Sequence, residues 1–343
     1  MSSVAARVKG SLGVRKIGAI YVWIVLIAFF SLVNSTFYEY ATFTQVLNQY
    51  AITGLVAMGL LLPLAAGLYD LSVGAVLGLS SMTAAWVLVN VTTNVFVAVL
   101  AGVAAALIVG VLNSVVLLVL RVDSFIGTLA TSSIVTAAVV ALSGDNVIAF
   151  EVFGDYGTWL GIHNIIGLTM PVGLLLIAIL VIAYLLERTG YGRRLYAIGY
   201  EEEVARLSGI RVDRMRAGSL LASSALAGLA GTLAAAAVGA GDPTVGPEYL
   251  LPAFAAVFLG ATQFRNGRFN PWGAAVAVLL LGTGNVGLIL IGAPTWTPNI
   301  FSGALLILAV ALTHGGRGGK RALKKQISEG SADAGAAEPA KVG

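Results

Sequence analysis

The sequence consists largely of long apolar stretches, each of about the length that a helix needs to cross a lipid bilayer. Crossing ~30 Å of hydrocarbon takes about 20 mostly apolar residues in an α-helix. Hydrophobic residues make up 58% of the 343 residues and charged residues only 10%, whereas soluble domains carry about 25% charged residues. The sequence therefore predicts an all-α polytopic membrane protein.

About ten membrane spans are expected from the order of apolar and polar segments. They cover residues 17–33, 45–66, 71–89, 95–120, 124–142, 169–186, 217–238, 250–264, 271–291 and 299–313. Several prolines fall at or beside an expected helix start, where a missing N–H costs nothing; these are Pro171, Pro252, Pro271 and Pro298. Pro63 lies inside the second span, and we expect it to break that helix.

The positive charges fix the expected orientation of these spans. With ten spans, all 20 lysines and arginines fall on one side of the membrane together with both termini, and basic residues accumulate on the cytoplasmic side. The expected organisation is a cytoplasmic N-terminus (1–16), a transmembrane domain (17–313) and a disordered cytoplasmic tail (314–343). The basic start of that tail is expected to contact anionic membrane lipid.

One long charged segment, residues 187–216, interrupts the apolar pattern. It holds seven arginines, and its glycines at 190, 192, 199 and 209 predict a turn followed by one short helix, Glu201–Ser208. Glu201, Glu202 and Glu203 lead this helix and Arg206 follows, an order that suits the helix dipole. A polar helix of this length cannot span a bilayer, so we expect it to dock on another protein. A solvated helix face remains the alternative.

Other kinds of site are absent from the sequence. The chain has no cysteine, and His163 has no second histidine or acidic pair at ligand spacing, so no metal site is expected. The stretch HGGRGGKR has His314 where a P-loop needs its first glycine and Arg321 where it needs Ser or Thr. The net charge of +4 is explained by the membrane orientation and does not indicate nucleic-acid binding. The chain is therefore expected to be non-catalytic and to bind no cofactor itself.

Four stretches resemble one family of transporters. GLYDLSVGAVLGLS, residues 67–80, is similar to the GGIDLSVG segment of permease subunits of bacterial ABC importers for ribose, xylose, galactose and related simple sugars. Three further stretches agree with that family in the same order: SFIGTLATSSI, RTGYGRRLYAIGYEEEVARLSGI and FLGATQFRNGRFNPWGA. The third of the four, in the charged segment, is the most specific.

The resemblance implies a permease in the bacterial cytoplasmic membrane whose cytoplasmic coupling helix docks on a separate ATP-binding subunit. ATP and Mg would lie on that subunit, an extracytoplasmic binding protein would deliver a monosaccharide or related polyol, and a second permease copy or paralogue would flank the pathway. The expected docking residues are Glu201, Glu202, Glu203, Arg206, Leu207, Ser208 and Gly209.

Two departures from the family pattern concern the substrate. Leu68 and Tyr69 stand where the family usually has glycine and isoleucine, and GATQFRNGRF, residues 260–269, replaces the small-residue turn GGTSLSGGRG. Bulkier groups at these turns suggest a preference other than ribose, such as a polyol or a modified sugar.

Few polar residues lie within the spans, and interhelical hydrogen bonds explain most such residues in membrane proteins. Because sugar hydroxyls need replaceable hydrogen-bond partners, we expect some to line the substrate pathway, and Asn48, Gln49 and Asn285 are the first candidates. Asp70 is a further candidate, although an N-cap of the third span is the simpler interpretation.

An ion-coupled secondary transporter of a small polar solute is the alternative to the ABC permease. Such carriers usually keep ionisable residues deep in the membrane, and only Asp70 approaches that description. The second and third spans with their turn also resemble the eighth and ninth with theirs, which suggests a faint internal repeat.

Overall fold

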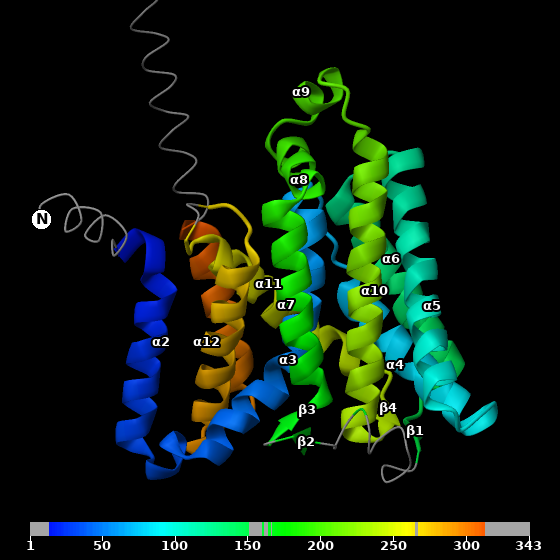
Figure 1. Cartoon of the computed structure of the whole chain (residues 1–343). Helices are drawn as coiled ribbons and strands as arrows, with labels where there is room; N and C mark the ends of the chain where they lie inside the picture. Colours follow the sequence, from blue (N-terminus) through cyan, green and yellow to red (C-terminus); the bar gives the residue numbers. More distant parts are fainter. Residues whose placement is uncertain (1–13, 151–159, 161–163, 166, 265–266, 313–343) are drawn as a thin grey trace, which may run out of the picture.

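The chain is described here from a computed structural model, which covers residues 14–150, 160, 164–165, 167–264 and 267–312. Within these residues it is a bundle of helices (Figure 1). The long helices and the two short ones are α2 (Val14–Val33), α3 (Tyr40–Ala65), α4 (Val73–Asn90), α5 (Val95–Ser114), α6 (Ser124–Ser143), α7 (Met170–Arg188), α8 (Gly190–Tyr200), α9 (Glu202–Leu207), α10 (Val212–Val238), α11 (Val245–Ala261), α12 (Pro271–Leu290) and a last helix, Thr297–Leu312.

Irregular helix and strand are limited to short pieces. A 3₁₀ turn, η1 (Ser35–Tyr38), precedes α3, and a π-helical turn, η2 (Val115–Val119), extends α5. Strand β1 (Ile148–Ala149) pairs antiparallel with β4 (Ala240–Gly241), and β2 (Asn164–Ile165) pairs with β3 (Leu168–Thr169). The predicted all-α polytopic class is confirmed.

Each of the ten expected spans corresponds to a helix. Seven helices are long and apolar enough to cross a membrane, and three shorter apolar helices, Gly18–Val33, Val245–Ala261 and Thr297–Leu312, account for the remaining spans. Helices α8 and α9 project from one end of the bundle, called here the α9 end (Figure 1). The β-strands lie at the opposite end, called the strand end. The N-terminal residues 1–13 and the tail 313–343, including the expected disordered segment, lie outside the described residues.

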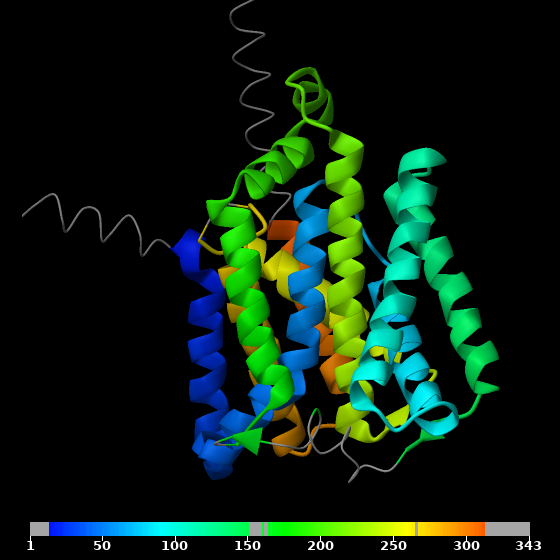
Figure 2. The same cartoon turned by 45° about the vertical axis from the view of Figure 1, so that its right-hand side comes forward.

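Helix α3 forms the centre of the bundle. It is buried along most of its length and packs against α7, α10, α11 and α12. Helices α5 and α6 form one edge and α2 the other (Figures 1 and 2). Helix α2 packs on α12, where the indole nitrogen of Trp23 donates to Thr283 Oγ1 at 2.8 Å and the ring of Phe30 covers Gly287.

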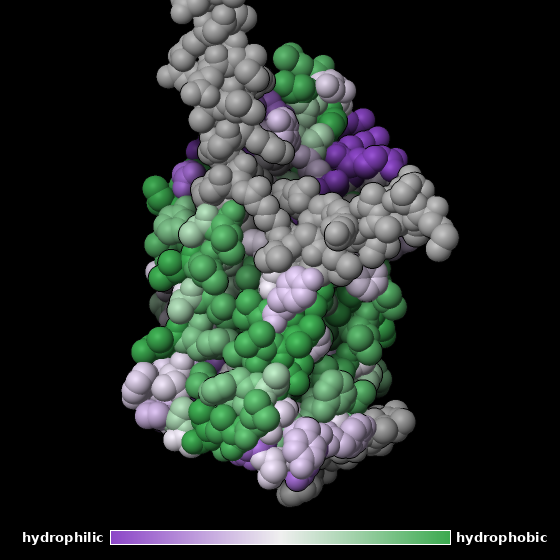
Figure 3. Space-filling view, turned by 90° about the vertical axis from the view of Figure 1, so that its left-hand side faces the viewer, coloured by the Kyte–Doolittle hydropathy of each residue, from purple (hydrophilic) through white to green (hydrophobic). Residues whose placement is uncertain are grey.

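The outer surface of the bundle is apolar where lipid tails would contact it. Figure 3 shows hydrophobic side chains over the middle of the face formed by the α2 edge, and strongly hydrophilic ones toward the α9 end. Helices α2, α5 and α7 expose large aliphatic residues such as Val25, Ile108 and Leu180. A large outward apolar surface of this kind marks contact with membrane lipid or with other proteins.

Two prolines behave differently from the expectation. Pro63 does not break α3, which continues to Ala65, because the proline lies in the last turn, where little of the helix remains to be broken. Pro252 lies inside α11, not at its start. The helix begins at Val245, directly after a turn in which Asp242 Oδ1 accepts the N–H of Thr244 at 2.7 Å, and membrane helices tolerate internal proline.

Glycines allow the closest helix crossings in the core. At Gly74 of α4, an added Cβ would lie 2.8 Å from the carbonyl oxygen of Gly246 in α11. Neither backbone can move without displacing the other helix, so this crossing requires glycine.

We expect Gly74→Val to destabilise the bundle, because overpacking of a tight core typically costs about 1–3 kcal/mol. Gly173→Val in α7 is the control, since an added Cβ there meets nothing within 4 Å. Thermal unfolding in detergent should show a lower Tm for Gly74→Val than for Gly173→Val. Equal Tm values would contradict the packing described here.

Candidate functional site

The turn between α3 and α4 enters the interior of the bundle. At its start, the carbonyl oxygen of Ala66 accepts from Arg216 Nε of α10 at 3.5 Å, whereas Asp70 Oδ2 accepts from Ser223 Oγ of the same helix at 3.2 Å. Seven residues of α10 separate these two contacts, which corresponds to roughly 10 Å along the helix. Non-helical backbone therefore lies at membrane depth, where it is tolerated only if buried in protein or lining a cavity.

Side chains satisfy the backbone of this turn. The N–H groups of Tyr69, Leu71 and Ser72 donate to Ser124 Oγ (3.2 Å), Thr128 Oγ1 (3.0 Å) and Asp70 Oδ1 (3.1 Å). An unsatisfied N–H at this depth would cost several kcal/mol. The polar residues of α6 and the carboxylate of Asp70 thus allow the chain to leave the helix inside the bundle.

Asp70 is fully buried and is not the N-cap of α4. The cap position belongs to Ser72, whose hydroxyl donates to Asp70 Oδ1 at 2.6 Å and accepts from Asn113 Nδ2 at 2.7 Å. The expectation of an Asp70 cap is wrong because the carboxylate turns inward to bind Ser72 and Ser223, and the helix begins two residues later than expected. Asp70 thereby joins the turn to α10, and Ser72 joins it to α5 through Asn113.

The turn between α11 and α12 is closed by a buried asparagine. Asn270 Oδ1 accepts the N–H of Gly273 at 2.7 Å, and its Nδ2 donates to the carbonyl oxygens of Gly260 and Gln263 at 3.1 Å each. Each of these contacts satisfies a backbone group at a helix end. Residues 265–266 of this turn lie outside the described residues.

The two departures from the family pattern meet in one aromatic cluster. The ring of Tyr69 stacks on Phe258 of α11 with 6.5 Å between centroids, and Phe258 packs edge-on against Phe269 at 5.5 Å. Tyr69 belongs to the first turn and Phe269 to the second. The bulky residues therefore pack against one another, and Tyr69 remains 39% exposed.

Helix α8 contacts both turns. Its glycines were expected to produce a turn. This prediction is wrong, because Gly190, Gly192 and Gly199 lie within the helix. Gly192 and Gly199 are needed because a side chain there would collide with the backbone of Leu186 and Ala65, respectively. Close approach, not a turn conformation, explains these glycines.

One tyrosine attaches α8 to the second turn. The hydroxyl of Tyr196 donates to the carbonyl oxygen of Phe269 at 2.6 Å, and the guanidinium of Arg268 lies 3.4 Å from the centre of the Tyr196 ring. The latter distance is typical of a cation–π contact. Together with Gly199 at the first turn, this contact makes α8 a bridge between the two turns.

Helix α9 begins one residue after the expected start and ends one residue before the expected end. Glu202 pairs with Arg206 at 3.0 Å and with Arg216 of α10 at 2.7 Å, and Arg206 also pairs with Asp213 at 3.2 Å. Partial burial alone raises the pKa of Glu202, but the hydrogen bonds and charges of Arg206 and Arg216 outweigh it, so the pKa lies below its ordinary value. These charges hold α9 against α10.

Three large apolar side chains are exposed in and beside α9, next to the exposed charged residues Glu203 and Arg206. Tyr200 is 91%, Val204 59% and Leu207 84% exposed, while Ala205 is buried against α8 and α10. Of these three, only Leu207 was among the expected docking residues. Val204 and Leu207 are three positions apart in α9, a spacing that places two side chains on one face of a helix, whereas Tyr200 is the last residue of α8. The expected residues Glu201, Glu203, Ser208 and Gly209 are also exposed.

The candidate pathway residues are dispersed. Asn48 Nδ2 donates to the carbonyl oxygen of Gly167, and its Oδ1 accepts from Thr169 N and Oγ1 at 3.0 Å, so it joins α3 to the segment before α7 at the strand end. Gln49 is exposed. Asn285 is buried, and its Nδ2 donates to Tyr50 Oη and Ser302 Oγ. The structure does not bring these residues together with Asp70.

Comparison with known proteins defines the class. Residues 42–310 match the family described as "Branched-chain amino acid transport system / permease component", and the chain belongs to this family. It is a multi-pass permease subunit of an ABC transporter and not the enzyme of that complex. No solved structure matches the chain.

Individual relatives are permeases named for sugars. The ribose import permease RbsC of Bacillus subtilis is 32% identical over 305 residues, covering 87% of this chain and 92% of the relative. The L-arabinose ABC transporter permease AraH of Azospirillum brasilense is 29% identical over 323 residues, covering 93% and 94%. The D-allose permease AlsC of Escherichia coli is 30% identical over 301 residues, covering 87% and 91%.

We expect Asp70→Leu to unfold or fail to insert correctly, because it leaves the donors of Ser72 and Ser223 buried without an acceptor, at about 1–3 kcal/mol for each unsatisfied group. Asp70→Asn keeps one acceptor oxygen for Ser72 and should retain most of the stability. Size-exclusion profiles and Tm values in detergent compare the two variants. A Leu variant as stable as the Asn variant would exclude this role for the carboxylate.

Proposed function

We propose that this chain forms the pathway by which a monosaccharide or related polyol crosses the bacterial cytoplasmic membrane, driven by ATP on a separate subunit. ATP and Mg bind to that subunit, and an extracytoplasmic binding protein delivers the substrate. A second copy of the chain or a paralogue completes the pathway. The membership in an ABC permease family and the sugar names of the relatives support this proposal.

The observation that carries the proposal is the group of exposed apolar side chains in and beside α9, formed by Tyr200, Val204 and Leu207. These three side chains are 59% to 91% exposed and lie within eight residues of one another in the chain. Apolar residues on a rigid helix, surrounded by charges, are typical of a protein-docking surface. The α9 end therefore receives the ATP-binding subunit and faces the cytoplasm, in agreement with the distribution of positive charge.

The contacts of α8 and α9 provide a route for coupling. Arg216 binds Glu202 of α9 and the carbonyl oxygen of Ala66 at the start of the first turn, and Tyr196 binds the second turn. A displacement of α9 by the ATP-binding subunit therefore moves both turns together. These are the segments where non-helical backbone lies inside the bundle, as in other transporters with interrupted helices.

The substrate class follows from the relatives and from the two turns. Ribose, L-arabinose and D-allose in the names of the relatives favour a monosaccharide, whereas the family description names branched-chain amino acids. The aromatic cluster of Tyr69, Phe258 and Phe269 gives the inner part of this bundle bulky, partly exposed surface. We retain the hypothesis of a polyol or modified sugar for this reason.

An ion-coupled carrier fits the contacts less well. Asp70 is hydrogen-bonded to two serines that fasten a turn, which is a structural use of the carboxylate. Transport by the complete complex should stop on ATP depletion and persist when the proton gradient is collapsed. The reverse pattern would exclude the proposal.

The docking prediction concerns Leu207→Asp. A charge in the centre of an apolar interface typically costs several kcal/mol, so co-purification of the ATP-binding subunit should fall at least tenfold while insertion and Tm remain normal. Val147→Asp, an exposed apolar position directly before β1 at the strand end, is the control for general effects of an added charge on the membrane protein. Normal capture of the ATP-binding subunit by Leu207→Asp would remove α9 as the docking element.

The coupling prediction concerns the pair Glu202 and Arg216. Glu202→Arg alone should lower the ratio of transported substrate to hydrolysed ATP, because it places two positive charges side by side. The double variant Glu202→Arg, Arg216→Glu restores opposite charges and should recover part of the ratio. If the ratio of transported substrate to hydrolysed ATP is no higher in the double variant than in both single variants, this ion pair does not couple the subunits.

The substrate prediction is tested by uptake into cells or vesicles with the complete importer. Uptake of one labelled monosaccharide or polyol should be competed by its close analogues and not by leucine or isoleucine. A preference for ribose would exclude the modified-sugar hypothesis but not the sugar importer. Competition by leucine alone would exclude the sugar importer.

A further inference from the structure

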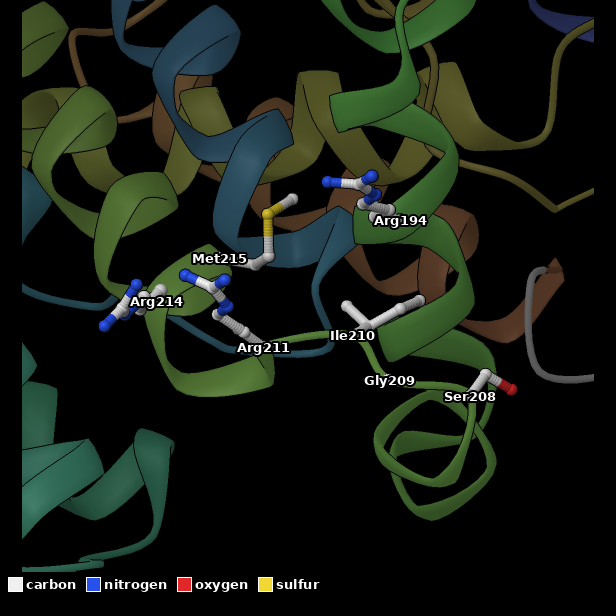
Figure 4. Close-up of a pocket in the computed structure, with 7 residues that line it drawn as sticks. All are labelled: Arg194, Ser208, Gly209, Ile210, Arg211, Arg214 and Met215. Atoms are coloured by element: carbon white, nitrogen blue, oxygen red, sulfur yellow. The ribbon is translucent and has the colours of Figure 1, made fainter.

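A basic pocket lies between α8 and the start of α10 (Figure 4). It has a volume of about 500 Å³ and is lined by Arg194, Ser208, Gly209, Ile210, Arg211, Arg214 and Met215. Figure 4 shows Arg194 extending from α8 and Arg211 from the beginning of α10, with Met215 between them. The pocket therefore combines positive side chains with an apolar floor.

The charges in this pocket are not neutralised within the described part of the chain. The neighbouring acids Glu202 and Asp213 pair with Arg206 and Arg216. No ion pair joins Arg194, Arg211 or Arg214 to a described carboxylate. Three arginines in one cavity repel one another, and a bound anion removes this repulsion.

The start of α10 adds to the positive potential. This helix is 27 residues long, and Arg211 at its N-cap makes no side-chain cap hydrogen bond. The first backbone N–H groups of a helix and its dipole favour an anion at this end. The pocket thus offers guanidinium groups and a helix N-terminus to the same ligand.

The depth of the pocket fits the headgroup layer of the membrane. Helix α7 ends at Arg188 after 19 residues, a length of about 28 Å that matches the hydrocarbon thickness. Helix α10 is about 40 Å long, longer than the hydrocarbon is thick, and Arg211 and Arg214 lie at its N-terminal end, next to the loop that carries α9. Phosphate groups of phospholipids occupy this layer.

We propose that this pocket binds the phosphate group of an anionic phospholipid of the membrane leaflet at the α9 end. Basic pockets beside membrane helices on the cytoplasmic side recognise such headgroups, and Met215 and Ile210 offer apolar surface to the glycerol backbone. Because the same loop carries α9 (residues 202–207), the lipid fixes the base of the docking element. The inference rests on the proposed function only in that the α9 end faces the cytoplasm. It does not require α9 to dock on the ATP-binding subunit.

The experiment measures the apparent Kd of phosphatidylglycerol for the purified full-length chain in detergent by native mass spectrometry. Phosphatidylcholine and inorganic phosphate are measured in parallel. We expect phosphatidylglycerol to bind more tightly than both. The variant Arg194→Gln, Arg211→Gln should bind it about thirtyfold more weakly, since each basic residue at such a surface contributes about fivefold.

The matched control is Arg188→Gln, Arg193→Gln, which removes the same charge from exposed positions outside the pocket and should leave the Kd within about twofold. Equal weakening by both double variants would show a nonspecific charge effect and overturn the proposal. Equal Kd values for inorganic phosphate and phosphatidylglycerol would exclude a lipid.

A fourth measurement separates the lipid from the protein partner. Capture of the ATP-binding subunit by the Arg194→Gln, Arg211→Gln variant is compared with its lipid binding. Lost capture with unchanged phosphatidylglycerol binding would assign the arginines to the protein interface and overturn the lipid site. Lost lipid binding by this variant supports the lipid site whether or not α9 docks on the ATP-binding subunit. Failure of the lipid proposal can therefore be distinguished from failure of the proposed function.

Discussion

The hydrocarbon layer offers no hydrogen-bond partner to a peptide group, and this constraint determines the rest of the structure. Most of the chain meets it by forming helices. In the turn between α3 and α4 the backbone leaves the helix inside the bundle, and there Ser124, Thr128 and Asp70 accept three of its N–H groups. These three polar side chains therefore stand where the backbone leaves the helix.

These internal turns are also the part of the bundle to which the α9 end is attached. Helix α8 touches the first turn through Gly199 and the second through Tyr196, and Arg216 joins α9 to the first turn. A region whose backbone is held by side chains can rearrange by exchanging hydrogen bonds, whereas a continuous helix would have to break. The attachment and the turns together are suited to a transporter that opens and closes.

The sequence was sufficient for the order of the apolar helices and for the short charged helix α9, because apolar length and charge distribution are local properties that survive folding. Details that depend on neighbours were missed. Gly192 and Gly199 indicate a turn in isolation, but the backbone of Leu186 and Ala65 packs against them in a helix. Pro252 was expected at the start of a helix, but α11 begins earlier, after the turn in which Asp242 accepts the N–H of Thr244.

The candidate site was predictable to a smaller extent. Asp70 was identified as an unusual charge, but its partner Ser223 lies 153 residues away and no local pattern reveals it. The exposed apolar residues Tyr200 and Val204 were not predicted, because the charged residues of this segment were taken as its main feature. The three arginines of the basic pocket also come from two separate helices, so their proximity is a property of the fold.

The packing of α2 has a consequence for the synthesis of the protein. Its tryptophan finds its partner on α12, 260 residues later in the chain. At about 5–20 residues per second, the ribosome needs roughly 10–50 s to supply that partner. During this interval α2 lacks the helix on which it packs, and the apolar side chains around most of its circumference suit it to lie against lipid until α12 is made.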